Sequence, residues 1–373
     1  MEAASSPPAV TSQAISSVTN TTNQPDITYS YHILGLTAAC VFIIAIVGTI
    51  GNFLAVVSLL LSKKLRRSPS TAFMINLPAC LLPVCTLGMT TYGIGCLQMQ
   101  QDGSVNYPDW AVIHFFTLGL ILSQVHLHTI CALAFNRMLA VVYPVTYKRV
   151  MQRRRVIVYL LVLWAYSTLL WLPLIFGVFG KLEYDSKELL VSMKTKSRSK
   201  RAIHVFFTYV LPILFTSACY IIMYYKLRQS RVNRMQHCRR KSVSEAAEER
   251  ALHQWDEQVT RTILVIFLVL LSCSVPHIVI HMLHLHDKLP AVWILLHVVF
   301  WLQFCIDPIV YMAMSQQYRE ATASCLRKVI PRIGMFTVSQ AEARSEARSD
   351  LRTEPSDNAQ ANSEKDAKYF QRV

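Results

Sequence analysis

Seven long apolar stretches run through the chain, and they constrain its fold more than any other feature. They lie near residues 31–61, 70–97, 110–142, 156–179, 202–226, 260–285 and 290–313. Each is longer than the roughly 20 residues that an α-helix needs to cross a bilayer. Because backbone N–H and C=O groups cannot stay unpaired in hydrocarbon, these stretches are expected to be helices. The sequence therefore predicts an all-α membrane protein built as a bundle of seven transmembrane helices.

The charged residues also favour a membrane protein. They make up only 16% of the chain, whereas a soluble domain carries about 25%. The net charge of +15 would suggest a nucleic-acid partner in a soluble protein. Here the basic residues cluster between the apolar stretches, where they orient helices and meet anionic headgroups. We therefore expect membrane lipid, and not nucleic acid, as a partner.

Lysine and arginine are concentrated in the segments that follow the first, third, fifth and seventh stretches. Cytoplasmic segments carry such an excess. The N-terminus is therefore expected outside the cell, and the C-terminus in the cytoplasm, of a multi-pass plasma-membrane protein. The segment 180–201 is an exception, because it is basic although it would lie outside.

The flanking regions follow from composition. Residues 1–30 are predicted to be a disordered extracellular tail with a glycosylation acceptor at Asn20, and residues 31–313 form the bundle. Residues 314–329 are predicted to form a short amphipathic eighth helix on the membrane surface, and residues 330–373 a disordered cytoplasmic tail. Cys325 is a lipidation candidate, with an ordinary cytoplasmic cysteine as the equal alternative.

Short motifs follow one another in order along the apolar stretches. They are Gly51-Asn52, Asn136-Arg137-Met138, Trp164 with Pro173, Pro212 with Tyr220, Cys273-Ser274-Val275-Pro276 and Asp307-Pro308-Ile309-Val310-Tyr311. With them, the chain resembles the rhodopsin-like (class A) G-protein-coupled receptors over about residues 31–330. Within that family, residues 71–77 and 301–321 are similar to Moody-like invertebrate receptors and to relatives of medium-chain fatty-acid receptors.

The resemblance implies a receptor that passes an extracellular signal to a heterotrimeric G protein by rearranging its helices. Arrestin is a further candidate partner, and neither a cofactor nor catalysis is implied. Arg137, beside Asn136, would pair with Asp256 when inactive and would be released to the G protein when active. Tyr220 and Tyr311 would complete the active arrangement. An arginine that merely snorkels to the membrane surface is the alternative.

Three family positions are altered in this chain. The helix-2 aspartate falls at Leu81, the helix-6 aromatic switch at Ser274 and the helix-3 cysteine at Val112. The segment 180–201 has no cysteine either, so no disulfide is expected there. These departures leave open a protein that has lost signalling or signals constitutively.

Asp307 is the only acid deep in the apolar stretches, and His126 would lie at a similar depth in the family register. We predict that the two interact and replace the lost acid of helix 2, because an acid beside a potential cation favours the charged pair. Two separately satisfied polar residues are the alternative. The predicted helix core also includes Asn52, Trp164, Pro212, Pro276 and Pro308.

Imidazole and amide side chains gather in the outer half of the predicted bundle. No acid occupies the amine counter-ion position, Gly119, and Trp301 replaces the retinal lysine of opsins. Together with the basic segment, this favours a non-amine ligand that is anionic or polar, such as a peptide or lipid. Interfacial polar residues without a ligand are the alternative. The pocket candidates are Gln124, His204, Thr208, His277, His281 and His297.

His277 and His281 are four residues apart and therefore share one helix face. This spacing permits zinc sensitivity, and a seven-helix zinc hydrolase is the enzymatic alternative. No acid accompanies the histidines on that face, so neither a metal site nor catalysis is predicted. Ser242 follows Arg239-Arg240-Lys241 and is a phosphorylation candidate.

Overall fold

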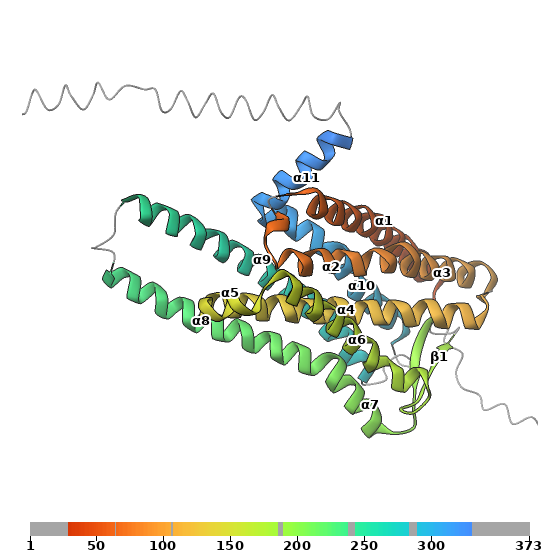
Figure 1. The fold of residues 1–373 in the computed structure, drawn as a ribbon. Coiled ribbons are helices and arrows are strands. Elements are labelled where there is room, and N and C mark those ends of the chain that lie inside the picture. Colours follow the sequence, from red (N-terminus) through yellow and green to blue (C-terminus); the bar gives the residue numbers. More distant parts are fainter. Residues whose placement is uncertain are drawn as a thin grey trace, which may run out of the picture.

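The computed structural model is a bundle of long helices (Figure 1), and it describes residues 29–63, 65–105, 107–185, 189–237, 243–282 and 289–329. In this part of the chain, seven helical spans are long and apolar enough to cross a membrane. The predicted spans are confirmed, with ends that differ by a few residues. The spans are Tyr31–Leu61, Thr71–Asp102, Ile113–Val142, Arg153–Ile175, Arg198–Gln229, Thr260–His281 and Pro290–Met314.

Five of the spans lie in continuous helices: α1 (Tyr31–Leu61), α4 (Asp109–Val142), α6 (Arg153–Ile175), α9 (Val243–Met282) and α10 (Pro290–Met314). The other two contain a π-helical turn, which apolar length alone does not predict. The second span consists of α2 (Thr71–Pro83), η2 (Val84–Met89) and α3 (Thr90–Asp102). The fifth consists of α7 (Arg198–Val205), η3 (Phe206–Val210) and α8 (Leu211–His237). Pro83 and Pro212 lie beside these turns and lack the N–H that a regular helix would use.

Shorter elements close the two ends of the bundle. A hairpin of β1 (Lys181–Asp185) and β2 (Leu190–Lys194) lies at one end, and α11 (Gln316–Val329) lies at the other (Figure 1). The hairpin packs on α4 and α6, and buried Leu189 joins the core beneath it. Two further short elements, η1 (Leu65–Arg67) and α5 (Pro144–Val150), follow the first and third spans. The predicted amphipathic helix is therefore present, whereas the segment expected to be a loop contains two paired strands.

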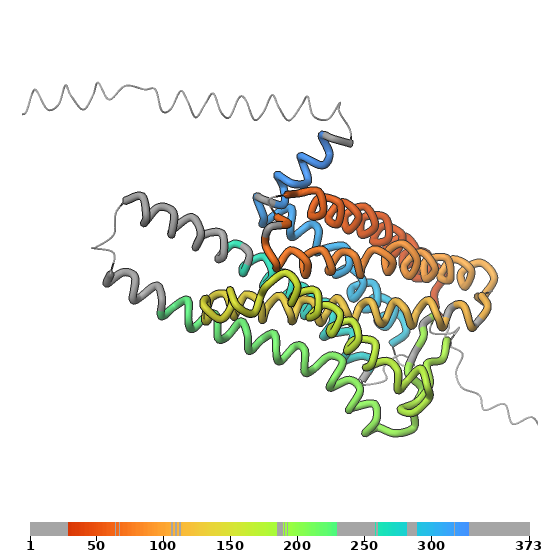
Figure 2. Tube along the Cα trace, in the orientation of Figure 1, coloured from red at the N-terminus to blue at the C-terminus, as the bar shows by residue number. Residues whose placement is uncertain are grey.

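Two hydrophobic clusters form the core, one toward the hairpin and one toward α11. On α4 the boundary between them falls between Val125 and Leu127, and on α10 it falls between Cys305 and Val310. His126 and Asp307 lie at these boundaries. α1 runs along α2 and α10 (Figure 2), and its Asn52 lies between the last residue of the first cluster and the first of the second. A polar layer therefore separates the two halves of the core.

The outer surface of the bundle is apolar. On α1, Ile43, Ile46, Ile50 and Phe53 are about three-fifths exposed and recur at helical spacing on one face. An exposed apolar stripe of this kind faces lipid in a membrane protein.

Candidate functional site

A side chain of α1 donates to a carbonyl of α10 that lacks its regular helix hydrogen bond. Pro308 has no N–H, so the carbonyl of Phe304, one turn earlier, has no donor from its own helix. Asn52 Nδ2 donates to this carbonyl at 2.9 Å and to the Gly48 carbonyl at 2.8 Å. The two helices can come this close because Gly51 has no Cβ: an added Cβ would lie 3.2 Å from the Pro308 ring. Predicted core residues Asn52 and Pro308 thus act together.

An amide side chain of α4 likewise donates to a carbonyl of the fifth span that lies one turn before a proline. Pro212 frees the carbonyl of Thr208, and Gln124 Nε2 donates to that carbonyl at 2.9 Å. The Gln124 amide also lies 3.2 Å from His128 Nε2, while His128 Nδ1 lies 2.7 Å from Ser167 Oγ. Gln124 therefore holds α4, the fifth span and, through His128, α6 in one register.

His126 and Asp307 form a buried pair in the polar layer. His126 Nε2 lies 2.7 Å from Asp307 Oδ2, and both side chains are almost fully buried. The predicted contact is thus present between α4 and α10. Leu81, at the altered helix-2 position, is fully buried in the hydrophobic core. A buried carboxyl group needs such a partner, because an unpaired charge is costly away from water.

A cavity with an empty volume of about 850 Å³, including its mouth, opens beside this pair. His126 and Gln124 line it together with aromatic and aliphatic residues from η2, α3, α4, η3, α8, α9 and α10. The polar lining also includes Ser123, Ser274 and Gln303. Ser274 Oγ donates to Gln303 Oε1 at 3.3 Å, which links α9 to α10. Gln303 is missed by motif reasoning, although a glutamine inside an apolar stretch is a visible signal.

The lining of this cavity does not include His204, Thr208, His277, His281 or His297. His204 lies near Thr208, with 3.5 Å between His204 Nε2 and Thr208 Oγ1, and its ring contacts Trp171. The predicted pocket residues therefore do not share one site. Gln124 faces the cavity, His204 and Thr208 lie on the fifth span, and the other three histidines lie between α9 and α10.

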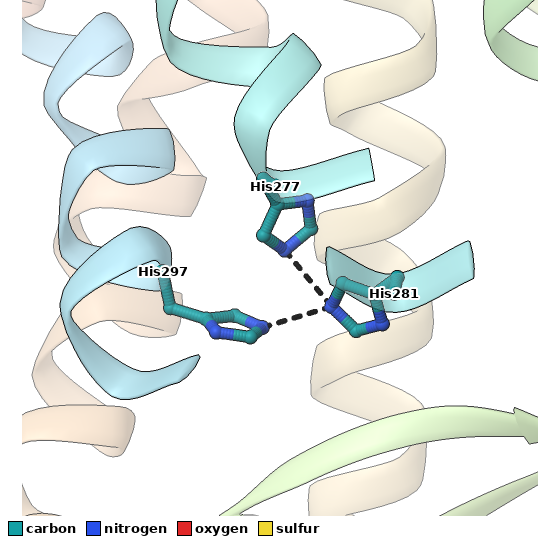
Figure 3. Close-up of side chains that lie close together, drawn as sticks. All are labelled: His277, His281 and His297. Carbon is teal, nitrogen blue, oxygen red and sulfur yellow. Dashed lines mark hydrogen bonds between the residues drawn. The ribbon is translucent and has the colours of Figure 1, made fainter. Parts of the chain in front are cut away.

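The three histidines between α9 and α10 have Nε2 atoms that converge (Figure 3). His281 Nε2 lies 3.1 Å from His277 Nε2 and 3.0 Å from His297 Nε2. His277 and His281 come from successive turns of α9, just after Pro276, and His297 comes from α10. Sequence spacing predicts the shared face of the first two, but the third depends on how α9 and α10 pack.

The end near α11 holds the residues expected to meet a G protein. Arg137 is only 3% exposed and Asn136 is fully buried. The Asn136 amide and the hydroxyl groups of Tyr220 and Tyr311 are buried, and among the described residues they have no hydrogen-bond partner. Tyr220 stacks on Phe267 of α9, with ring centroids 5.7 Å apart. The side chain of Asp256 lies outside what the structure describes, so the predicted pair with Arg137 stays a prediction.

Trp164 ties three helices together. Its indole Nε1 donates to Asn76 Oδ1 at 3.0 Å, and Asn76 Nδ2 donates to Thr129 Oγ1 at 2.7 Å. These contacts join α6 to α2 and α2 to α4. They give the predicted core tryptophan a structural role.

The remaining predicted residues concern modification. Tyr318, Thr322 and Cys325 form the buried face of α11, and the Cys325 side chain is 3% exposed. Burial raises the pKa of Tyr318 to about 12. Lipidation of Cys325 stays a prediction, and it would require this face to open. Asn20, Ser242 and nearly all of both predicted tails lie outside the described residues.

Comparisons with known proteins agree with this architecture. Drosophila melanogaster G-protein coupled receptor moody is 24% identical over 351 residues, which cover 79% of this chain and 51% of that protein. Human melatonin receptor type 1B is 23% identical over 291 residues, covering 76% of this chain and 75% of that protein. This chain spans about half the length of the moody receptors that it matches.

A solved structure supports the fold. Squid rhodopsin has a TM-score of 0.69 and 17% identity, with 82% of this chain and 87% of that chain covered. The family profile described as 7 transmembrane receptor (rhodopsin family) matches residues 51–311, well over half of the chain. This multi-pass membrane protein therefore belongs to the rhodopsin family of seven-transmembrane receptors.

Proposed function

We propose that this chain binds an extracellular ligand and activates an intracellular heterotrimeric G protein, with arrestin as a second cytoplasmic partner. The observation that carries the proposal is one continuous arrangement. His126, the partner of Asp307, lines the cavity, and the core on the other side of that pair holds Arg137, Tyr220 and Tyr311. A ligand in the cavity would touch the helices whose opposite ends meet the G protein. The zinc-hydrolase alternative gains no support, since the matched relatives are named as receptors.

The N-terminus would lie outside the cell and the C-terminus in the cytoplasm. Exposed Arg153, Arg154 and Arg155 begin α6 at the α11 end, in line with an excess of positive charge inside. Epitope tags at the two termini of intact cells test this: only the N-terminal tag should be accessible. Two accessible tags would overturn the topology.

The cavity favours a non-amine ligand with a large apolar part. Its lining is mainly aromatic and aliphatic, and none of its lining residues is an aspartate or glutamate. Gly119, the counter-ion position for amines, is part of that lining. A polar or anionic group on the ligand would meet Gln124 or His126. The lysines of the hairpin strands are exposed, as are Arg198 and Lys200 of α7, whereas Arg201 is half-buried. None of these residues lines the cavity, so they would act on the ligand only at longer range.

Signalling would be a shift between two helix arrangements, driven by a ligand that binds one better than the other. The buried hydroxyl groups of Tyr220 and Tyr311 support a second arrangement, because buried polar groups normally have partners. Movement of α8 and α9 would bring partners to them and release Arg137.

A G-protein dissociation panel in cells tests the proposal, first without ligand and then across a ligand library. Wild type should dissociate at least one G-protein class, and Arg137→Ala should not. Arg154→Ala is the matched control, since it removes an exposed positive charge at the same end. Equal signals from wild type and Arg137→Ala, at matched surface expression, would refute a receptor mechanism that runs through Arg137.

The ligand site has its own test. A Cβ added at Gly119 would meet no heavy atom within 4 Å, so a large side chain there would enter the cavity without disturbing packing. Gly119→Phe should abolish the response to any active ligand, while Gly119→Ala should keep it. Retained responses in Gly119→Phe would place the ligand elsewhere.

A further inference from the structure

The three histidines between α9 and α10 form a cluster that the receptor mechanism does not use. Each ring can supply one metal-ligand nitrogen, and the three ligand nitrogens lie within 4.8 Å of one another (Figure 3). We propose that His277, His281 and His297 bind one Zn²⁺ ion through their Nε2 atoms and so fasten α9 to α10. This proposal stands apart from G-protein coupling and from the nature of the ligand.

The separations are close to those of a zinc centre. Zn–N bonds of 2.0–2.1 Å in tetrahedral geometry place neighbouring nitrogens about 3.3 Å apart. His281 Nε2 already lies 3.1 Å from His277 Nε2 and 3.0 Å from His297 Nε2. The third separation, between the ligand atoms of His277 and His297, is at most 4.8 Å, so these rings need to close by at most about 1.5 Å to seat the ion between all three.

The hydrogen bonds among the three rings cannot use every Nε2 atom well. His297 Nδ1 lies 2.7 Å from the Trp293 carbonyl, which can only accept, so Nδ1 carries the proton. In neutral His297 the Nε2 atom then carries a lone pair, and this lone pair points at His281. His281 Nε2 faces two other Nε2 atoms, and its single N–H can serve only one of them well. A cation at the centre would accept the lone pairs of all three rings.

The surroundings fix the rings in this orientation. The Nδ1–H bond from His297 to a backbone carbonyl is the outer-shell contact that metal-ligating histidines usually make. His277 stacks on Phe300 with centroids 4.3 Å apart, and the ring centroids of His281 and Trp293 lie 4.2 Å apart. A site whose ligands are already oriented loses little entropy when the ion binds.

Imidazole ligands suit Zn²⁺, and three of them leave the fourth position of a tetrahedral ion open to water or to a carboxylate. Both helices contribute ligands, so the ion would stabilise arrangements in which α9 and α10 stay close at this end. By linkage, Zn²⁺ would change the balance between helix arrangements in proportion to its preference for one of them.

Zinc titration of the full-length protein in lipid nanodiscs, read by competition with a fluorescent chelator, tests the site. Wild type should bind one ion, and His277→Ala, His281→Ala and His297→Asn should each weaken binding at least about tenfold, because even outer-shell losses cost 10–100-fold. His297→Asn keeps a donor for the Trp293 carbonyl but lacks Nε2. His114→Ala, which removes an exposed histidine of α4, is the matched control and should bind as wild type does. Equal affinity in all variants, or no binding by wild type, would overturn the proposal.

X-ray absorption at the zinc edge, on wild type with one equivalent of Zn²⁺, gives a readout that does not depend on any variant folding. Imidazole nitrogen scattering without sulfur supports the three-histidine site. Sulfur in the coordination shell would assign the ion to cysteines, of which the chain has 10, and would reject the site. Neither outcome depends on whether the protein activates a G protein.

Discussion

At the scale of single residues, buried polar side chains compensate for backbone defects that prolines create. Asn52 and Gln124 are amides on different helices, yet each donates to the carbonyl that lies one turn before a proline of a neighbouring helix. A buried carbonyl left without a donor costs about 1–3 kcal/mol. The amides therefore turn two helix defects into contacts between helices.

Asn52→Ala should lower the free energy of unfolding by about 1–3 kcal/mol, since it leaves the buried Phe304 carbonyl with only the weak Cys85 thiol, at 3.9 Å, as a side-chain donor. Thermal unfolding of the purified protein in one detergent measures the change. Ser58→Ala is the control on the same helix, because the Ser58 hydroxyl is buried without a partner among the described residues. That control should be neutral or slightly stabilising, and an equal loss in both variants would contradict the assigned role.

His126→Ala removes the partner of Asp307, and breaking a buried ion pair typically costs about 3–5 kcal/mol. Asp307→Asn in the same chain should restore much of this loss, because it removes the buried acid as well. Thermal unfolding of the two single variants and the double variant forms a double-mutant cycle. Strictly additive losses would mean that the two side chains do not act as a pair.

At the scale of elements, the long spans are predictable and the short ones are not. Apolar length alone gives the seven spans, because a helix is the one solution for such runs in lipid. The hairpin is missed since its strands have only five residues each, in a segment whose charge suggests a solvated loop. The π-turns are missed as well, because they depend on how prolines and neighbouring helices share hydrogen bonds.

Gly180→Ala should displace the hairpin. Gly180 has φ of 142°, and an added Cβ would lie 2.6 Å from the Lys194 carbonyl oxygen and 2.8 Å from Thr195 Cβ. The combined strain and clash should cost about 1–3 kcal/mol. Faster tryptic cleavage of native protein within residues 181–201 is the measurement, since this segment is rich in lysine.

Gly103→Ala is the control for Gly180→Ala, because it introduces a strained backbone without a steric clash. Gly103 also has a positive φ, of 65°, but an added Cβ there meets nothing within 4 Å. Its substitution should leave cleavage within residues 181–201 unchanged. Unchanged cleavage in Gly180→Ala would mean that the hairpin does not depend on this close approach.

At the scale of the whole molecule, the bundle consists of two hydrophobic clusters with a polar layer between them. The resemblance to the receptor family predicts the pair that forms this layer, because the family register places His126 at a depth similar to that of Asp307. It names Gln124, His277, His281 and His297 as candidates for one pocket, but it does not predict that Gln124 lines a cavity apart from the three histidines, or that His297 meets the other two. Both depend on the register between helices, which the spacing within one helix does not contain.

At the end of the bundle near α11, removing buried hydroxyl groups should affect stability and signalling differently. Tyr220→Phe and Tyr311→Phe each delete a buried hydroxyl that has no partner among the described residues, so the free energy of unfolding should stay equal or rise. If signalling needs these hydroxyl groups paired in a second arrangement, the same variants should reduce G-protein activation several-fold. Thermal unfolding and G-protein dissociation on the same samples measure both effects. Tyr224→Phe, one turn along α8 and 62% exposed, should change neither. A loss of stability without a loss of signalling would mean that the hydroxyl groups serve the resting fold and not the switch.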